Sequence, residues 1–204
     1  MNTYNDPQIL TRNALEYFLE TDRIALRKEI LKPRLFGDDV WKFQRLLRTA
    51  EYLSTCLDPW SRMRLYLVRW ALKQAGFKLG FSIPLHVFGA GLSIAHPGTI
   101  VVNTLTKVGE NCRIHACVNI GTTGGSLKAP QIGHNVYIGP GAKIIGDIVL
   151  GDNLVIGANA VVVHSFPEGN CTIGGIPAKV ISPRDSTEHL VKATQIVSRK
   201  IHEI

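Results

Sequence analysis

The sequence predicts a mainly β fold, a parallel β-helix that follows a helical region and precedes a short helical tail. Three observations support this prediction: helical spacing of apolar residues before residue 80, a six-residue period after it, and amphipathic spacing after residue 183. We therefore divide the chain into a helical region at 1–80, a β-helix domain at 81–182 and a tail at 183–204.

Three stretches of the helical region have apolar residues at helical spacing, at 6–31, 38–57 and 58–77. The first and the third open with an Asp-Pro pair, which suits a helix cap and first turn. The third mixes Trp60 and Trp70 with arginines and lysines, and two interpretations stay open. The helix packs against a neighbouring helix, or it lies weakly on a membrane surface.

The β-helix domain has an aliphatic residue at nearly every sixth position, namely Val102, Val108, Ile114, Ile120, Ile132, Ile138, Ile144, Leu150, Ile156 and Val162. Such a repeat winds three short strands into a triangular coil of about 18 residues, with the aliphatic side chains stacked inside. Glycine often follows the aliphatic residue, and we expect it to supply a corner conformation that other residues reach only with strain.

One segment departs from the repeat. Residues 120–131 keep the register but carry Ser126 at the aliphatic position, together with three glycines and Pro130. This composition predicts a loop displaced outward from the wall. Loops on a rigid scaffold often carry functional residues, so the segment is a candidate part of a site.

The tail at 184–204 has the spacing of one amphipathic helix. An open end of a β-helix exposes unpaired backbone groups, and we expect the tail to cap that end. Contact with a neighbouring subunit is the alternative.

Composition excludes several classes of function. The formal charge is +7, but aromatic residues are not interleaved with the basic ones as a nucleic-acid stacking platform requires, so no nucleic-acid partner is expected. No apolar run reaches the roughly 18 residues of a membrane-spanning helix, and no secretory signal opens the chain, which favours a cytoplasmic protein. The four cysteines lack CxxC spacing and are predicted to be small core residues.

The segment HPGTIVVN at 96–103, the six-residue repeat and the segment GGIPAKVI at 174–181 resemble the serine acetyltransferase-like branch of the hexapeptide acyltransferases. The resemblance covers roughly residues 82–182. It implies a left-handed parallel β-helix, a homotrimer with sites in the clefts between adjacent prisms, and acetyl-CoA as the cosubstrate.

His96 occupies the position of the family's catalytic histidine, twelve residues before Val108. An alcohol is too weak an acid to attack a thioester unassisted, and an imidazole that titrates near neutrality can take its proton. Backbone amides of Gly124 and Gly125 are candidate donors to the oxyanion. We expect His115 to contact the acceptor or to support the residues that do.

His115 and His134 follow His96 at intervals of nineteen, so all three histidines are expected near one edge of the prism. A metal site therefore has to be considered. The related β-helix carbonic anhydrases have two of their three histidines close in sequence, a spacing absent here, and we expect no metal.

The resemblance implies that coenzyme A lies along a prism edge, contacted by backbone amides, small residues and a basic residue of the closing segment. The positions that match in this sequence, with the two loop glycines included, are Gly124, Gly125, Gly139, Ala142, Ala158, His164 and Lys179.

The acceptor is where this sequence departs from the family. Serine-specific members have Asp directly before the catalytic histidine and a second histidine after the glycine loop, whereas this chain has Ala95 and Ala129. Loss of these polar groups favours O-acetylation of a sugar hydroxyl of a capsule or exopolysaccharide pathway. Serine O-acetylation for cysteine biosynthesis is the alternative, and a non-catalytic β-helix scaffold is an alternative of another class.

Overall fold

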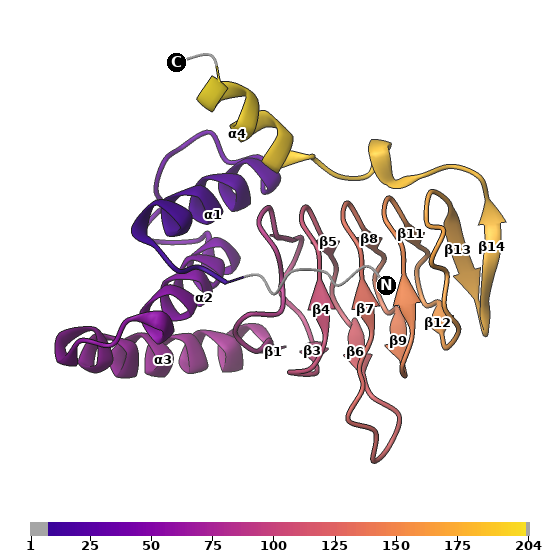
Figure 1. Cartoon of the computed structure of the whole chain (residues 1–204), viewed down its shortest axis with the longest axis horizontal. Coiled ribbons are helices and arrows are strands. Elements are labelled where there is room, and N and C mark those ends of the chain that lie inside the picture. The colour runs from indigo at the N-terminus through magenta and orange to yellow at the C-terminus, as the bar shows by residue number, and fades with distance from the viewer. Residues whose placement is uncertain (1–7, 203–204) are drawn as a thin grey trace.

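The computed structural model describes residues 8–202 and has a helical end joined to a triangular prism (Figure 1). The helices are α1 (Arg12–Ala25), α2 (Asp39–Thr55) and α3 (Pro59–Leu79). The last two match the predicted stretches. The first helix is shorter than predicted. At its start, the Thr11 side chain caps the helix by accepting from the Ala14 N–H at 3.1 Å, and the Asp-Pro pair at 6–7 lies outside the described residues. Soon after its last residue, Ala25, the backbone of Arg27 takes a left-handed φ of 56°.

Helix α3 has two apolar faces. Leu72, Ala75 and Gly76 lie on the face that packs against the core, which agrees with packing against a neighbouring helix. The opposite face is exposed and carries Trp60, Met63, Tyr66, Leu67, Trp70 and Phe77. Five basic residues and no acidic residue occur in this helix. Within residues 8–202, no helix is long and apolar enough to cross a membrane.

Three walls of parallel strands form the prism. Wall A consists of β1 (Phe81–Ser82), β3 (Ile100–Val102), β6 (Asn119–Gly121), β9 (Lys143–Ile145) and β12 (Val161–Val162). Wall B consists of β4 (Lys107–Val108), β7 (Gln131–Ile132) and β10 (Val149–Leu150). Wall C consists of β2 (Ser93–Ile94), β5 (Arg113–Ile114), β8 (Tyr137–Ile138), β11 (Val155–Ile156), β13 (Thr172–Gly175) and β14 (Ala178–Ser182), of which the last pair is antiparallel.

The register confirms a coil of 18 residues, because Val101 pairs with Asn119 and Tyr137 with Val155. The aliphatic residues of the six-residue period are buried inside the prism, from Val102 to Val162, whereas Ser126 is not buried. The fold is the left-handed parallel β-helix that the sequence predicted.

The glycines that follow Val108, Ile138 and Leu150 are required for space and not for their backbone angle. A Cβ on Gly109 would lie 2.8 Å from the carbonyl carbon of Gly133, and one on Gly139 would lie 2.7 Å from the Ile156 oxygen. The expectation that these glycines adopt a left-handed conformation is wrong. Other corner residues adopt it, among them a column of asparagines whose side chains are hydrogen-bonded to one another, at Asn111, Asn135, Asn153 and Asn170.

The displaced loop is confirmed: residues 122–130 leave the prism between β6 and β7 and project from it (Figure 1). The tail differs from the prediction. It forms a short 3-10 turn (Ser186–Glu188) and α4 (Ala193–His202), runs back along the prism, and packs α4 against α1. Thr194 fixes this path by hydrogen bonds to Asn111, so the tail does not cap the last coil.

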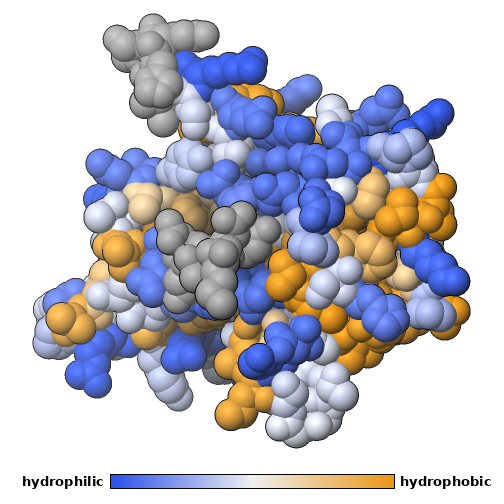
Figure 2. All heavy atoms as spheres, turned by 45° about the vertical axis from the view of Figure 1, so that its right-hand side comes forward, coloured by the Kyte–Doolittle hydropathy of each residue, from blue (hydrophilic) through white to orange (hydrophobic). Residues whose placement is uncertain are grey.

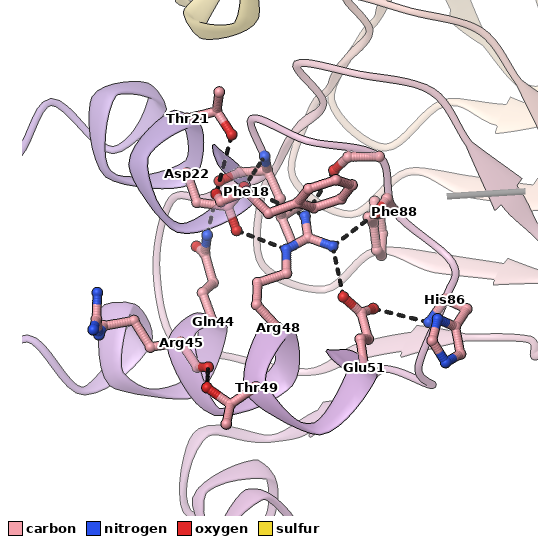
Figure 3. A network of polar contacts seen from close by, with 12 residues as sticks. Phe18, Thr21, Asp22, Gln44, Arg45, Arg48, Thr49, Glu51, His86 and Phe88 are labelled. Carbon is pink, nitrogen blue, oxygen red and sulfur yellow. Dashed lines mark hydrogen bonds and ion pairs between the residues drawn. The ribbon is translucent and has the colours of Figure 1, made fainter. Parts of the chain in front are cut away.

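A buried polar network joins the helical end to the first coil (Figure 3). The Arg48 guanidinium ion-pairs with Asp22 at 2.8 Å and Glu51 at 3.0 Å and donates to the backbone oxygens of residues 88 and 89. The Gln44 side-chain amide donates to the Leu92 oxygen at 2.7 Å and accepts from the Ile94 N–H at 3.0 Å. Gln44 thus pairs with the free edge of β2 as another strand would, and β2 ends directly before the segment that carries His96.

Candidate functional site

His96 lies on the edge between walls C and A, here called the His96 edge. The corner that carries it is two residues longer than a regular one, because the aliphatic positions Ile94 and Val102 are eight residues apart where Ile114 and Ile120 are six apart. The imidazole is exposed, and the preceding residue is held by a hydrogen bond from the Ala95 N–H to the Ile114 oxygen at 2.9 Å. A rigid wall therefore presents a solvent-accessible imidazole.

His115 lies next to His96 on the following coil, with ring centroids 6.3 Å apart. Its Nδ1 is 3.0 Å from the Ile138 carbonyl oxygen, and because a carbonyl only accepts, Nδ1 carries the proton. Burial lowers the pKa of His115, although this hydrogen bond opposes the shift. A neutral ring results at pH 7, with the Nε2 lone pair free to accept a hydrogen bond.

His134 does not join the other two histidines, contrary to expectation. It lies on the edge between walls B and C, where its ring Nδ1 accepts from the Glu110 backbone N–H at 3.0 Å and its backbone N–H donates to the Asp152 carboxylate at 2.7 Å. The interval of nineteen residues does not place His134 beside His115, because the displaced loop lengthens that coil by six residues. Within the part of the chain that the structure describes, no three His, Cys, Asp or Glu side chains form a group able to hold a metal ion.

Three further residues line wall C beside the histidines and were not predicted as site residues. The Tyr137 ring lies 4.8 Å from His115 and 5.1 Å from His189, between centroids. Arg113 pairs in register with Ser93 and Tyr137 and donates to the Ser93 hydroxyl at 3.0 Å. Strand register is the signal that finds Tyr137 and Arg113, whereas nothing in the repeat signals His189, which comes from the tail.

The glycine loop lies on a different edge, the one between walls A and B, here called the loop edge. Gly124 and Gly125 are exposed, and apart from their chain neighbours nothing in residues 8–202 lies within 4 Å of where their Cβ atoms would be. His164 is exposed on the same edge, two residues past the end of β12. Within one chain, therefore, the predicted oxyanion donors do not flank His96.

The remaining candidates for coenzyme A divide between surface and core. Ala158 is exposed on the His96 edge, and Lys179 is exposed on β14. Ala142 is fully buried in the prism, so its methyl group contacts only the core. Gly139 is buried against the next coil, which gives this glycine a packing role.

The two alanines predicted to lie at the acceptor site have different surroundings. Ala95 is partly exposed beside His96, whereas Ala129 is buried at the base of the loop. No side chain of residues 8–202 forms a hydrogen bond with the His96 ring. The cysteine prediction holds for Cys112, whose thiol pKa is raised by burial, and is wrong for Cys117, which is exposed on the His96 edge.

Comparison with known proteins agrees with this fold. The family model for bacterial transferase hexapeptide (six repeats) matches residues 129–164. A serine acetyltransferase of Helicobacter pylori is 38% identical over 125 residues, which cover 59% of this chain and 72% of that protein. A serine acetyltransferase of Mycobacterium tuberculosis is 36% identical, with 60% of this chain and 54% of that protein covered.

Solved structures give the same result. A serine acetyltransferase from Brucella abortus in complex with coenzyme A superposes with a TM-score of 0.66 and 28% identity, over 86% of this chain and 71% of that one. A soybean serine acetyltransferase complexed with serine has a TM-score of 0.66 and 26% identity, over 82% and 69% of the two chains.

A β-helix of six-residue repeats with an exposed histidine on a widened corner defines a hexapeptide-repeat transferase. Within that class, the chain belongs to the serine acetyltransferase-like family of acyltransferases. The interpretation as a non-catalytic scaffold is therefore set aside.

Proposed function

We propose that the protein transfers the acetyl group of acetyl-CoA to the hydroxyl of L-serine, with His96 as the base. The observation that carries the proposal is an exposed imidazole at the widened corner of a chain whose similar proteins are serine acetyltransferases. The preference for a capsule or exopolysaccharide sugar drawn from the sequence finds no support among these relatives, and serine becomes the first candidate.

His96 acts twice in this reaction. Its imidazole takes the proton of the hydroxyl while the oxygen forms a bond to the thioester carbon. The tetrahedral intermediate then collapses, the carbon–sulfur bond breaks, and the imidazolium returns its proton to the leaving thiolate. The products are an O-acetyl ester and free coenzyme A, with His96 in its starting state.

His115 supports this chemistry without exchanging a proton. Its proton is committed to the Ile138 carbonyl, so its Nε2 accepts a hydrogen bond from the acceptor or from His96. A neutral neighbour also avoids repulsion when His96 becomes positively charged. We therefore assign His115 a positioning role.

Acetyl-CoA supplies the activated acetyl group. The exposed Ala158 and the small Gly157 leave the His96 edge open to a long ligand, while Gly139 forms the floor beneath them. Lys179 and His164 are the exposed polar groups proposed to meet the nucleotide end.

A homotrimer resolves the separation of His96 from the glycine loop. The loop edge carries four exposed apolar side chains, namely Leu105, Leu127, Val149 and Val163. Figure 2 shows apolar side chains gathered on part of the prism surface. Contact between the loop edge of one copy and the His96 edge of the next covers these side chains and brings the Gly124 and Gly125 amides to the imidazole.

A sugar hydroxyl is the second candidate acceptor, and one observation favours it. Ala95 leaves no carboxylate beside His96 to engage the ammonium group of serine. Neutral sugars have no ammonium group and so do not require that carboxylate.

The experiment follows thiol release from acetyl-CoA by the purified chain with L-serine or with neutral sugars, and identifies the ester by mass. We expect release with serine and a His96→Asn loss of about 10²- to 10⁴-fold in kcat. Release with sugars alone would show the serine assignment to be wrong, and full activity of His96→Asn would exclude His96 as the base.

A further inference from the structure

A cavity of about 530 Å³ lies between the helical end and the prism, directly beside His96. Ala95 and Pro97, the two chain neighbours of His96, both line it, and Arg113 lies on the same side. Arg27 and the start of α2 line the opposite side. A larger cavity of about 740 Å³ lies under α3, and its lining includes neither His96 nor these neighbours.

The carboxylates that line the cavity beside His96 are already paired with cations. Asp38 is 2.5 Å from the Lys28 ammonium and also accepts from the Arg34 N–H. Asp39 is 2.8 Å from the Lys78 ammonium. These hydrogen bonds hold the pKa of both carboxyl groups below its ordinary value, so neither is available to neutralise a further cation.

The two arginines of the cavity have no such partner. Arg113 donates to the Ser93 hydroxyl, a neutral group, and neither Arg113 nor Arg27 forms an ion pair within residues 8–202. Burial lowers the pKa of Arg113; Tyr137 opposes this shift, and the positive charge of Arg27 adds to it. Two arginines that line one cavity and pair with neither of its carboxylates form a binding site for an anion.

We propose that this cavity, the anion pocket, binds a carboxylate or phosphate group of the acceptor while the acceptor's hydroxyl lies at His96. The inference rests on the proposed function and adds what it lacks, a means of holding the acceptor where Ala95 and Ala129 offer no charge. Serine supplies a carboxylate, and a phosphorylated sugar supplies a phosphate. Neutral sugars supply neither and are excluded by the pocket.

The test compares two variants of the full chain with a control. Arg113→Gln removes one guanidinium, and Arg27→Asn removes the other with a residue that tolerates the left-handed backbone at φ 56°. Arg62→Gln on the exposed surface of α3, outside both cavities, is the matched control. Thermal melting confirms that all three variants are folded.

Steady-state thiol release is measured with L-serine in one arm and D-glucose 1-phosphate in the other. We expect each pocket variant to raise the KM of the active acceptor by about ten- to a hundredfold and to change the KM of acetyl-CoA less than about twofold. Activity with L-serine indicates that the pocket binds a carboxylate, and activity with D-glucose 1-phosphate indicates that it binds a phosphate. An unchanged acceptor KM in Arg113→Gln, or an equal rise in Arg62→Gln, overturns the proposal.

A binding measurement separates this proposal from the proposed function. Calorimetric titration with inorganic phosphate and with L-serine needs no turnover, and we expect the wild-type chain to bind at least one of them and Arg113→Gln to lose at least tenfold in affinity. Binding that depends on Arg113 without any thiol release refutes the proposed function and leaves the anion pocket standing. If neutral acceptors support thiol release, and the wild-type chain and Arg113→Gln bind anions equally or not at all, the anion pocket is refuted while the transferase activity stands.

Discussion

Replacement of Arg48 by methionine tests the joint between the helical end and the β-helix. The guanidinium is fully buried and provides the cation for Asp22 and Glu51, the donors for two backbone oxygens, and a contact with the Phe18 ring at 4.9 Å (Figure 3). Methionine fills much of the same volume and replaces none of these polar contacts. Two carboxylates are then left buried without a cation.

The expected loss follows from that desolvated charge. Removing one partner of a buried ion pair costs about 3–5 kcal/mol, because the remaining charge has neither water nor a counterion. For a chain of this length, about 1 kcal/mol corresponds to roughly 2–4 °C, so the melting temperature should fall by about 6–20 °C. Arg45→Met, one turn earlier on α2 and only partly buried, should change it by less than about 3 °C.

The assay is calorimetric melting of both variants and of a triple variant in which Asp22→Asn and Glu51→Gln accompany Arg48→Met. The two amides still accept from the Leu92 and His86 N–H groups but carry no charge. Recovery of a substantial part of the loss is expected. A loss in Arg48→Met no larger than in Arg45→Met, or no recovery in the triple variant, would refute the reasoning.

Three more predictions address the site and the surface. Gln44→Ala frees the edge of β2 and should lower kcat several-fold with little change in the KM of acetyl-CoA, whereas equal kcat would deny Gln44 a role in positioning His96. Because burial lowers the pKa of His115, the unfolded chain binds more protons there, and stability should fall as the pH drops below about 6.5; His115→Gln should flatten that part of a melting-versus-pH curve, and an unchanged slope would contradict it. The exposed face of α3 should bind phosphatidylglycerol vesicles weakly at low salt, and a Trp60→Ala, Trp70→Ala variant should sediment less with them than wild type; no binding by the wild type would remove the membrane-surface interpretation.

Much of the prism follows from the sequence because its stability is local. Each aliphatic residue such as Ile138 or Ile144 stacks on the same position in adjacent coils, so periodicity alone predicts the core and the coil length. The sequence did not reveal why glycine is needed at these corners. The need arises from the short distance between stacked coils, as between Gly109 and Gly133, which only the structure shows.

The parts of the site that escaped prediction depend on long-range placement. His134 moved to another edge because the loop at 122–130 adds residues to one coil, and a fixed interval does not count them. The anion pocket joins Arg27 to Arg113 across the helical end and the prism, and no sequence period links the two. The role of His96 was predicted from its position along the chain alone. The residues that surround it could be found only from the three-dimensional structure.

Mixed trimers test the central claim, that His96 of one copy and the glycine loop of the next share one site. His96→Asn chains are co-expressed at equal levels with Gly124→Pro chains, which lack the backbone N–H of the loop. Each variant alone should be nearly inactive, and random mixing should restore about one quarter of wild-type thiol release, because an intact site needs the histidine from one kind of chain and the loop from the other. Activity no greater than that of the two variants measured separately would contradict the account.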